Sequence, residues 1–380
     1  MNKRFLLLGS YWLRNVGDEA MLYVSLEQLG AFFPEAHFSV VAQGEVTVPS
    51  SVRHRTSLVR RTVGSILWQL SVSDSLVRAG GLFLCDFVGS RRGPRTLFKT
   101  CSLLLAAKIL RTKVSLLGVG AGPIYTRLGR LLARPACSLV DYAIVRDKVS
   151  YDLLCSLGME GRVSLGFDVA ALLSPVGEQR PSSPTVNGQP RVLGVSVVPF
   201  FKRFYHDRRR DNELMDRFVE PIKQYLKADG AREVRLFIFG GDLKEGDIGA
   251  TELLKQGLAG EERVEVVPHD PDPGRMLSRV AECDIFLGMR LHSCFFAYCG
   301  NVPFLMVTYH PKCRAIASEI GLPQEAVISV SDIMDGRLGE RFKLFCEEPR
   351  SFSPSVPPQV SQQKIREALL QFSGKVKGSA

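Results

Sequence analysis

One stretch near the middle of the second half constrains the fold of this 380-residue chain most strongly. Its residue order predicts a short apolar strand at 284–287, a turn at Gly288, an apolar helix over 291–299 and another strand at 303–307. A strand, a helix and a second strand in this order form the repeating unit of a parallel sheet. The chain is therefore expected to fold as an α/β protein around this unit.

Polar side chains follow the first strand of this unit. Arg290, His292 and Ser293 open the predicted helix, at the edge of the sheet where α/β proteins bind ligands. The first turn of a helix also favours an anion, because its backbone N–H groups point outward. No acid occurs between Asp284 and Glu319, so the sequence predicts a negatively charged ligand. Alternatively, the Arg and His only cap the helix or hold a contact between domains.

Positive charge is concentrated in the first half of the chain. The net charge is +10; residues 1–180 hold 22 Lys and Arg against 13 Asp and Glu, whereas residues 181–380 hold 27 against 26. Two windows, 46–73 and 87–140, contain no acid. Such a surface attracts phosphates, anionic glycans or membrane headgroups. No nucleic-acid-binding motif accompanies the charge, so we expect no nucleic acid partner.

Composition predicts a large core and no membrane span. Hydrophobic residues make up 45% of the chain, which is enough for two domains. The nine cysteines form no CxxC pair, which favours buried thiols over disulfides or zinc ligands. The apolar stretch 102–110 is much shorter than the roughly 18 residues of a membrane span. We expect a cytoplasmic protein without a metal ion.

Two segments mix basic and apolar residues. The first, 53–70, is consistent with an amphipathic helix on a membrane, but an ordinary helix with its apolar side in the core is favoured. Through its charge, the N-terminal domain still offers a surface for peripheral membrane association. The second, 200–210, either lines a ligand site or starts a solvated helix.

Several turns after predicted strands carry candidate functional residues. Gly17 permits a tight turn or close substrate approach, and Asp18 either only begins a helix or deprotonates an acceptor hydroxyl. The glycine turn at 118–123 is similar to a dinucleotide fingerprint. However, Pro123 replaces an amide that a phosphate would need, and the next acid, Asp141, lies inside a strand, so a dehydrogenase is excluded.

The alternation of strands and helices divides the chain in two. A segment rich in Pro, Ser, Gln and Asn separates the halves and is interpreted as a linker. The predicted organisation is a basic N-terminal domain at 1–178, a linker at 179–190, a C-terminal domain at 191–348, and a tail with a crossing helix at 349–380.

These motifs resemble those of the polysaccharide pyruvyl transferases. The resemblance rests mainly on Gly-Met-Arg-Leu-His-Ser at 288–293 and Tyr-His-Pro-Lys at 309–312, and it extends to Asn-Val-Gly-Asp-Glu at 15–19. Ala79 and Val169 depart from the family pattern, which has Gly and Pro at these places. The resemblance implies an α/β fold of two Rossmann-like domains facing across a cleft, similar to glycosyltransferase B. It also implies transfer of the enolpyruvyl unit of phosphoenolpyruvate to a sugar as a pyruvate ketal.

The resemblance also implies roles for individual residues. Arg290 and His292 match the family's donor-binding and catalytic pair. Histidine readily exchanges protons near neutral pH, so His292 is the expected general acid, and Asp18 is the candidate base. The cations Arg290 and Lys312 suit the phosphate and carboxylate of the donor. The remaining predicted contacts are Gly288 and Ser293 on the donor side, and Asn15, Gly17, Asp86, Arg146 and Asp247 in the cleft or at the acceptor. For Arg146, a salt bridge with Asp147 or a neighbour at the start of a helix is an equal alternative.

Phosphoenolpyruvate is expected as co-substrate, and no further cofactor is expected. The expected acceptor is a sugar or a lipid-linked glycan. A glycosyltransferase that uses a nucleotide sugar on the same fold is the main alternative, since fold does not determine chemistry. A non-catalytic glycan-binding or lipid-binding protein is the other.

Overall fold

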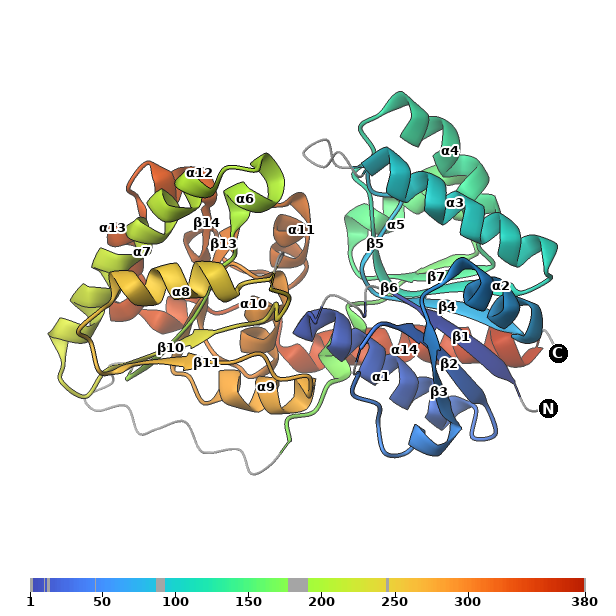
Figure 1. Ribbon diagram of the computed structural model, residues 1–380, viewed down its shortest axis with the longest axis horizontal. Coiled ribbons are helices and arrows are strands. Elements are labelled where there is room, and N and C mark those ends of the chain that lie inside the picture. Colours follow the sequence, from blue (N-terminus) through green and yellow to red (C-terminus); the bar gives the residue numbers. More distant parts are fainter. Residues whose placement is uncertain are drawn as a thin grey trace. The chain divides into compact units, whose positions relative to one another are not determined.

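The computed structural model describes residues 3–9, 11, 14–44, 46–86, 93–176, 191–243 and 246–378. They form two compact units (Figure 1). The first consists of Met1–Trp12, Asp18–Leu173 and Gln359–Ala380, and the second of Leu13–Gly17 and Ser174–Pro358. The predicted linker at 179–190 lies outside the described residues. Residues 349–358, expected in a C-terminal tail, group with the second unit.

The first unit is built on a parallel sheet in the order β3-β2-β1-β4-β6-β7-β8, with the short β5 paired to β6. Its inner strands β4, β6 and β7 are buried along nearly their whole length, as expected where helices cover both faces of a parallel sheet, whereas the edge strand β3 is largely exposed. The strands are β1 (Arg4–Leu8), β2 (His37–Ala42), β3 (Thr56–Arg60), β4 (Ser75–Ala79), β5 (Leu82–Phe83), β6 (Lys113–Ala121), β7 (Tyr142–Val145) and β8 (Val163–Leu165). The α-helices are α1 (Val16–Phe32), α2 (Val63–Val72), α3 (Gly93–Ile109), α4 (Arg127–Ser138), α5 (Lys148–Leu154) and α14 (Pro358–Gly378).

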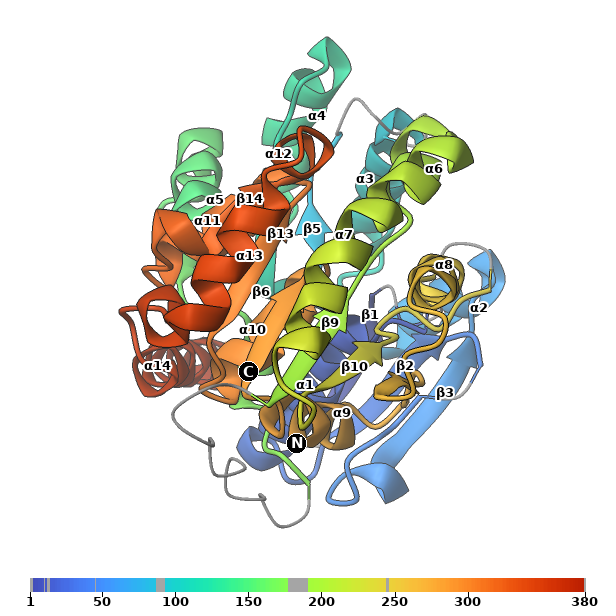
Figure 2. The ribbon, with the colours of Figure 1, turned by 90° about the vertical axis from the view of Figure 1, so that its left-hand side faces the viewer.

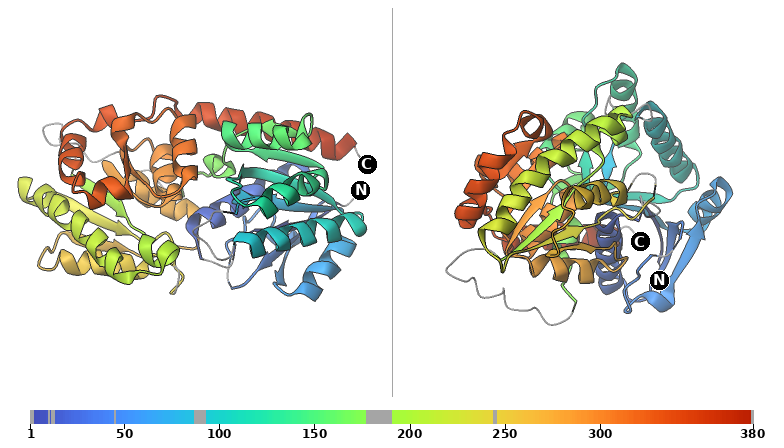
Figure 3. Two further views of the ribbon diagram at one scale, coloured as in Figure 1. Left: turned by 90° about the horizontal axis from the view of Figure 1, so that it is seen from above. Right: turned by 60° about the vertical axis from the view of Figure 1, so that its left-hand side comes forward.

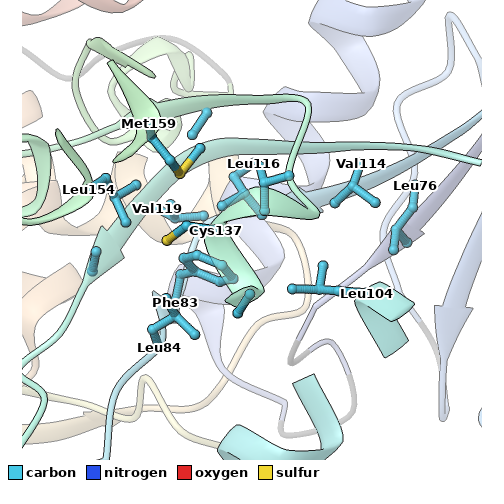
Figure 4. Close-up of a cluster of buried hydrophobic side chains, with 14 of the residues drawn as sticks. Leu76, Phe83, Leu84, Leu104, Val114, Leu116, Val119, Cys137, Leu154 and Met159 are labelled. Carbon is cyan, nitrogen blue, oxygen red and sulfur yellow. The ribbon is translucent and has the colours of Figure 1, made fainter. Parts of the chain in front are cut away.

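Helices α2, α3 and α4 pack on this sheet through one apolar cluster (Figure 4). Leu70 of α2, Leu104 of α3 and Ala133 of α4 are buried in it, together with strand residues such as Leu76 and Leu116. The three helices therefore cover the same face of the sheet.

The favoured interpretation of residues 53–70 as one helix is wrong. The segment contains a 3-10 turn at Arg53–Arg55, the strand β3, and the start of α2. β3 pairs in parallel with β2, with Val40 opposite Leu58. The strand ends at Arg60, and two residues later Thr62 caps α2 by accepting a hydrogen bond from the amide of Ser65. Sheet pairing, which a local pattern does not reveal, overrides the helical periodicity here.

The last helix packs on the first unit, as Figure 3 shows for α14. Phe372 stacks on Tyr142 with ring centroids 6.1 Å apart, and the Lys375 ammonium donates to the carbonyl of Gly161 at 2.9 Å. Ile365 is fully buried. These contacts explain why the C-terminal segment groups with the first unit although it follows the second in sequence.

The second unit contains a six-stranded parallel sheet in the order β11-β10-β9-β12-β13-β14. Numbered from its first strand, this is the order 3-2-1-4-5-6 of a Rossmann fold. Figure 2 shows the sheet behind α7 and α13, which contact each other. The strands are β9 (Val192–Ser196), β10 (Glu233–Phe237), β11 (Val264–Val267), β12 (Ile285–Gly288), β13 (Phe304–Thr308) and β14 (Val327–Ser329). The α-helices are α6 (Phe200–Tyr205), α7 (Arg208–Ala228), α8 (Ile248–Gly257), α9 (Pro273–Ala281), α10 (Leu291–Cys299), α11 (Pro311–Glu319), α12 (Val330–Met334) and α13 (Leu338–Glu347).

The central strand-helix-strand unit predicted from the sequence is confirmed as β12, α10 and β13. Gly288 is the last residue of β12 and not part of the turn. A Cβ at this position would lie 2.5 Å from the Cys294 sulfur, so the glycine allows the helix to pack close to the end of the strand. None of the helices in the described part of the chain is long and apolar enough to cross a bilayer.

Candidate functional site

The candidate site lies at the carboxyl ends of β9 and β12. These strands are neighbours, with Gly288 opposite Ser196, and the strand order reverses between them. Chain segments leave such neighbouring strands in opposite directions and open a crevice for ligands. Arg290 lies two residues after the end of β12 and is the N-cap residue of α10. Arg290 thus lies at the edge of the sheet where α/β proteins bind ligands.

Arg290 forms a buried ion pair with Asp247. Its Nε donates to the two carboxylate oxygens at 2.8 and 3.0 Å, and its Nη2 donates to Oδ1 at 2.5 Å. Arg290 is 8% exposed and Asp247 is 0% exposed. The Gly240 amide also donates to Asp247, at 2.7 Å, and a Cβ on Gly240 would lie 2.5 Å from Nη2 of the arginine. The orientation of the planar guanidinium is thus fixed by the carboxylate of Asp247 and by the close backbone of Gly240.

This pair corrects one expectation. Asp247, predicted in the cleft or at the acceptor, is the partner of the donor-side arginine. The absence of acids near Arg290 in the sequence therefore does not hold in space, because Asp247 comes from a segment 43 residues earlier. It follows β10, whose carboxyl end lies at the same edge of the sheet as that of β12.

Ser293 acts inside the protein. Its hydroxyl lies 2.6 Å from the hydroxyl of Ser196 and donates to the Arg290 carbonyl at 2.8 Å. Ser293 is 0% exposed. The Met289 amide donates to the Ser196 carbonyl at 2.8 Å, which holds the same turn from its other end. Ser293 therefore positions the turn that carries Arg290, and its direct donor contact stays a prediction.

The Asn-Val-Gly motif at 15–17 belongs to this site. Asn15 forms an antiparallel bridge with Gly240, and the Val16 amide donates to the Phe239 carbonyl at 3.0 Å. The Gly241 amide donates to the Arg14 carbonyl at 2.7 Å. These bonds attach the motif to the segment that follows β10. They also explain why Leu13–Gly17 groups with the second unit.

His292 packs directly against Gly17. A Cβ on Gly17 would lie 2.0 Å from Nδ1 of the imidazole, so any other residue would displace the ring. The half-buried His292 also lies edge-on to the ring of Phe295, with centroids 6.3 Å apart. The close approach predicted at Gly17 therefore exists, and the group that approaches is the predicted catalytic imidazole.

Asp18 groups with the first unit, at the end of the strands β1 and β4. Burial raises the pKa of Tyr11 well above its usual range, and the negative charge of Asp18 raises it further. Burial lowers the pKa of Arg78, and the charges of Tyr11 and Asp18 oppose this shift. The Tyr11 hydroxyl donates to the Ala79 carbonyl at 3.5 Å. Asp18 thus lies in the field of a buried tyrosine and arginine, neither of which the sequence had singled out.

Asp86 holds a turn of the first unit. Its carboxylate accepts hydrogen bonds from the Tyr125 amide at 2.6 Å, the Thr126 amide at 2.9 Å and the Thr126 hydroxyl. Burial raises the pKa of Asp86, but these hydrogen bonds outweigh burial and lower the pKa below its usual value. Asp86 is 1% exposed. These bonds give Asp86 a role inside the first unit, and its predicted contact in the cleft or at the acceptor stays a prediction.

Arg146 is also internal. It is 2% exposed, with Nη1 at 3.3 Å from Asp168 and Nε at 3.6 Å from Asp147. Asp168 also caps the following turn by accepting from the Ala170 amide, as its sequence position predicts. The ion pair with Asp147 is the alternative expected for Arg146, and a contact of Arg146 with a ligand stays a prediction.

Lys312 is the second residue of α11. This helix follows β13, the strand next to β12. The Lys312 amide donates to Nδ1 of His310 at 3.2 Å, and the ammonium lies 5.8 Å from the ring centroid of Tyr309. Because β12 and β13 pair in parallel, Gly288 opposite Met306, the turns with Arg290 and Lys312 leave the same edge of the sheet. The two predicted donor cations thus follow adjacent strands.

A pocket of about 640 Å³ opens at the carboxyl ends of β13 and β14. Aromatic rings of α6 reach its edge, and Phe200 lies 6.2 Å from Tyr309 between ring centroids. Arg210 lies over the ring of Phe201 at 4.0 Å. Both interpretations of residues 200–210 are therefore partly observed, since α6 lines the pocket and the exposed Arg208–Arg210 start the solvated helix α7. The charged and hydroxyl-bearing lining residues are Tyr205, Arg210, Thr308, Tyr309, His310, Arg314, Ser329, Ser331 and Asp335.

Comparison with solved structures shows the fold. UDP-GlcNAc 2-epimerase from Neisseria meningitidis bound to UDP-GlcNAc has a TM-score of 0.60 at 12% identity, covering 97% of this chain and 100% of that one. MnaA of S. aureus, in a co-structure with UDP, has a TM-score of 0.59 at 12% identity over 95% and 94% of the chains. Anabaena HepE in complex with UDP and glucose has a TM-score of 0.59 at 13% identity over 99% and 100%. The glycosyltransferase-B-like fold of two Rossmann-like domains is thereby confirmed.

Comparison of sequences shows the family. The amylovoran biosynthesis protein AmsJ of Erwinia amylovora is 21% identical over 308 residues, which cover 78% of this chain and 71% of AmsJ. The family model of polysaccharide pyruvyl transferases matches residues 15–311, a range that begins at Asn15 and includes Asp247, Arg290 and His292. The chain belongs to the polysaccharide pyruvyl transferase family.

Proposed function

We propose that this protein transfers the enolpyruvyl unit of phosphoenolpyruvate to two hydroxyls of a sugar, forming a pyruvate ketal. The observation that carries the proposal is the packing of His292 on Gly17 beside the Arg290–Asp247 pair. A proton-transfer group and an oriented cation are combined there at the ligand-binding edge of a Rossmann-like sheet.

The donor is held by cations in this proposal. Arg290 presents a guanidinium whose orientation is fixed by Asp247, and a guanidinium fork matches the geometry of a carboxylate or phosphate. Asp247 balances the charge of Arg290, so Lys312 supplies the uncompensated positive charge for the second anionic group of phosphoenolpyruvate. The start of α10 adds the partial positive charge of a helix N-terminus.

The proposed reaction proceeds in two additions to one carbon. His292 donates a proton to the vinyl CH₂ of phosphoenolpyruvate, and a first sugar hydroxyl attacks the neighbouring cationic carbon and loses its proton. The C–O bond to phosphate then breaks, and a second hydroxyl closes the ketal. One hydroxyl proton replaces the proton lost by His292 and the other leaves with phosphate, so the products are the ketal and inorganic phosphate. Asp18, next to Gly17 in the chain, is the proposed base.

The acceptor in this proposal is a sugar within a glycan or a lipid-linked glycan precursor. The role of AmsJ in amylovoran biosynthesis, given by its name, supports a glycan substrate. The pocket of the second unit supports binding of a further part of the ligands, since it offers Tyr205 and Tyr309 for stacking and Arg210 and Arg314 for anions.

Nucleotide-sugar transfer is the second candidate. Asp247 places a carboxylate at the site, and the aromatic lining of the pocket could stack with a base. The structurally similar MnaA of S. aureus was solved with UDP, and the similar epimerase of Neisseria meningitidis was solved with UDP-GlcNAc. Family membership favours phosphoenolpyruvate instead, because the motif segments of this chain match the pyruvyl transferases.

A thermal shift experiment separates the two candidates. Phosphoenolpyruvate at about 100 times its Kd should stabilise the native protein by roughly 2.7 kcal/mol, and UDP-sugars should not. The stabilisation should disappear in Lys312→Ala and Arg290→Ala, and persist in Arg217→Ala, which removes an exposed arginine of α7. His292→Ala should bind phosphoenolpyruvate but release no phosphate in the presence of acceptor glycan. Stabilisation by a UDP-sugar alone would reject the proposal.

A further inference from the structure

Large apolar side chains are exposed on three helices of the first unit. Of the 18 exposed large hydrophobic residues in the described part of the chain, 11 lie between Leu58 and Leu131. Trp68 of α2 and Phe98 of α3 are each 66% exposed, and Leu131 of α4 is 72% exposed. Because scattered apolar residues are normal but concentrated ones mark interaction sites, this surface needs a partner.

Helix α3 is apolar on two sides. Its residues Phe98, Leu105 and Ile109 are exposed, and at 100° per residue they fall on a stripe about 40° wide. Leu97 and Leu104 point to the core and are 2% and 3% exposed. The inner side is explained by the sheet beneath it, whereas the outer stripe serves no packing within the first unit.

The neighbouring helices extend this surface. Helix α3 contacts both α2 and α4, and all three bury their inner sides in the same core cluster, so their outer sides face away from the same face of the sheet (Figure 1). The apolar-basic face is defined by the exposed apolar residues Val63, Leu67, Trp68, Phe98, Leu105, Ile109, Leu128 and Leu131, and by the basic residues Lys99, Lys108, Arg111, Arg127, Arg130 and Arg134.

The charge of this face has one sign. No acid occurs in residues 46–73, which include α2, or in residues 96–140, which include the described side chains of α3 and all of α4. On α3, Lys99 and Lys108 lie about 100° and 80° to either side of Phe98. An apolar stripe with cations on both flanks is the pattern of helices that lie in the interface of an anionic membrane. Indole rings such as that of Trp68 are also enriched at this depth.

We propose that the apolar-basic face docks the protein on an anionic phospholipid bilayer. The apolar side chains enter the headgroup region, and the flanking Lys and Arg bind lipid phosphates. A second copy of the chain fits this face less well, because its own cations would oppose those of the first. Docking does not depend on the proposed transfer reaction and would bring the enzyme to lipid-linked glycans if these are its acceptors.

Vesicle binding tests the proposal. The full chain should co-sediment with vesicles of equal phosphatidylglycerol and phosphatidylcholine, and hardly with phosphatidylcholine alone. The variant Trp68→Ser/Phe98→Ser/Ile109→Ser should bind at least tenfold more weakly. Its matched control, Val149→Ser/Val360→Ser/Leu370→Ser, removes equally exposed apolar residues from α5 and α14 and should bind as the wild type does.

Two further measurements address the charge and the geometry. Replacing Lys99, Lys108 and Arg111 by Gln should weaken binding to anionic vesicles roughly a hundredfold at low salt, at about fivefold for each cation. The chain has two tryptophans. In a Trp12→Phe background, the emission of Trp68 should therefore shift to the blue on binding.

Three outcomes would overturn the proposal. These are equal binding to neutral vesicles, equal loss in the control variant, and a dimer in vesicle-free solution that the Trp68, Phe98 and Ile109 substitutions dissociate. The last result would assign the face to a second copy of the chain. The vesicle experiments contain neither phosphoenolpyruvate nor an acceptor sugar. A failure of vesicle binding would therefore not count against the proposed transfer reaction, and a failure of phosphoenolpyruvate binding would not count against membrane docking.

Discussion

Asp247 holds the guanidinium of Arg290 through contacts of 2.8, 3.0 and 2.5 Å in the interior of the second unit. The two residues come from the segments after β10 and β12. Each requires the other, since a single buried charge without its partner is strongly unfavourable. The pair therefore serves both the stability of the unit and the orientation of the proposed donor ligand.

Replacing Asp247 by Asn should destabilise the protein by about 3–5 kcal/mol, because the buried Arg290 charge loses its counter-charge. Chemical denaturation measures the effect. The control Asp152→Asn removes an exposed ion pair with Lys148 and should change stability by less than about 1 kcal/mol. In a double-mutant cycle, Asp247→Ala and Arg290→Ala together should cost clearly less than the sum of the single changes. Additive losses would show that the pair is not coupled.

Replacing Gly17 by Ala should displace His292, since the new Cβ would lie 2.0 Å from the imidazole nitrogen. A shift of about 1 Å in a catalytic group costs on the order of a hundredfold in rate. The measurement is phosphate release from phosphoenolpyruvate with acceptor glycan. Gly339→Ala, in an open position of α13, should leave the rate unchanged and raise stability slightly. Unaltered activity in Gly17→Ala would separate Gly17 from the function of His292.

Acid should weaken the first unit partly through Asp86. Its pKa is lower in the folded protein than in the unfolded chain, so it contributes stability above about pH 4, and this stability is lost as the pH falls through the folded pKa. Asp86→Asn should reduce stability at pH 7 and flatten its decline between about pH 5 and 2. Denaturation midpoints over this range, compared with those of the exposed-site variant Asp216→Asn, would show whether the difference has the expected sign.

Buried thiols should resist alkylation in the native protein. Burial raises the pKa of Cys137 to about 12 and that of Cys346 to about 12, and it also raises the pKa of Cys294. Since the thiolate is the reactive form, iodoacetamide at pH 7.5 should label these residues only after unfolding. Peptide mass spectrometry should find earlier labelling at the half-buried Cys155. Rapid native labelling of Cys294 would contradict the tight packing of α10 against β12.

The strand-helix-strand unit around Arg290 could be predicted because its signals are local. Apolar runs of strand and helix length, with a glycine between them, determine the element types, and the parallel arrangement determines the edge at which Arg290 and His292 lie. The motif at 15–17 was likewise identified from its residues. Its attachment to Phe239 and Gly240 was not predictable, because backbone pairing over more than 200 residues leaves no local pattern.

The error in segment 53–70 had the same cause. The segment was expected to form one helix because the pairing of β3 with β2 is invisible in its own periodicity. The internal partners of Asp86 and Arg146 were likewise not fully predictable, because only the fold brings Thr126 and Asp168 near them.

The sequence by itself determined the α/β class, the two Rossmann-like sheets, the family and the positions of Arg290 and His292, because apolar periodicity and short motifs are properties of neighbouring residues. The tertiary structure alone decided that Asp247 neutralises Arg290, that Gly17 packs against the ring of His292, and that Ser293 stabilises the turn that carries Arg290. These depend on which strand ends meet at one edge of a sheet, and strand order is set by long-range packing that no window of sequence contains.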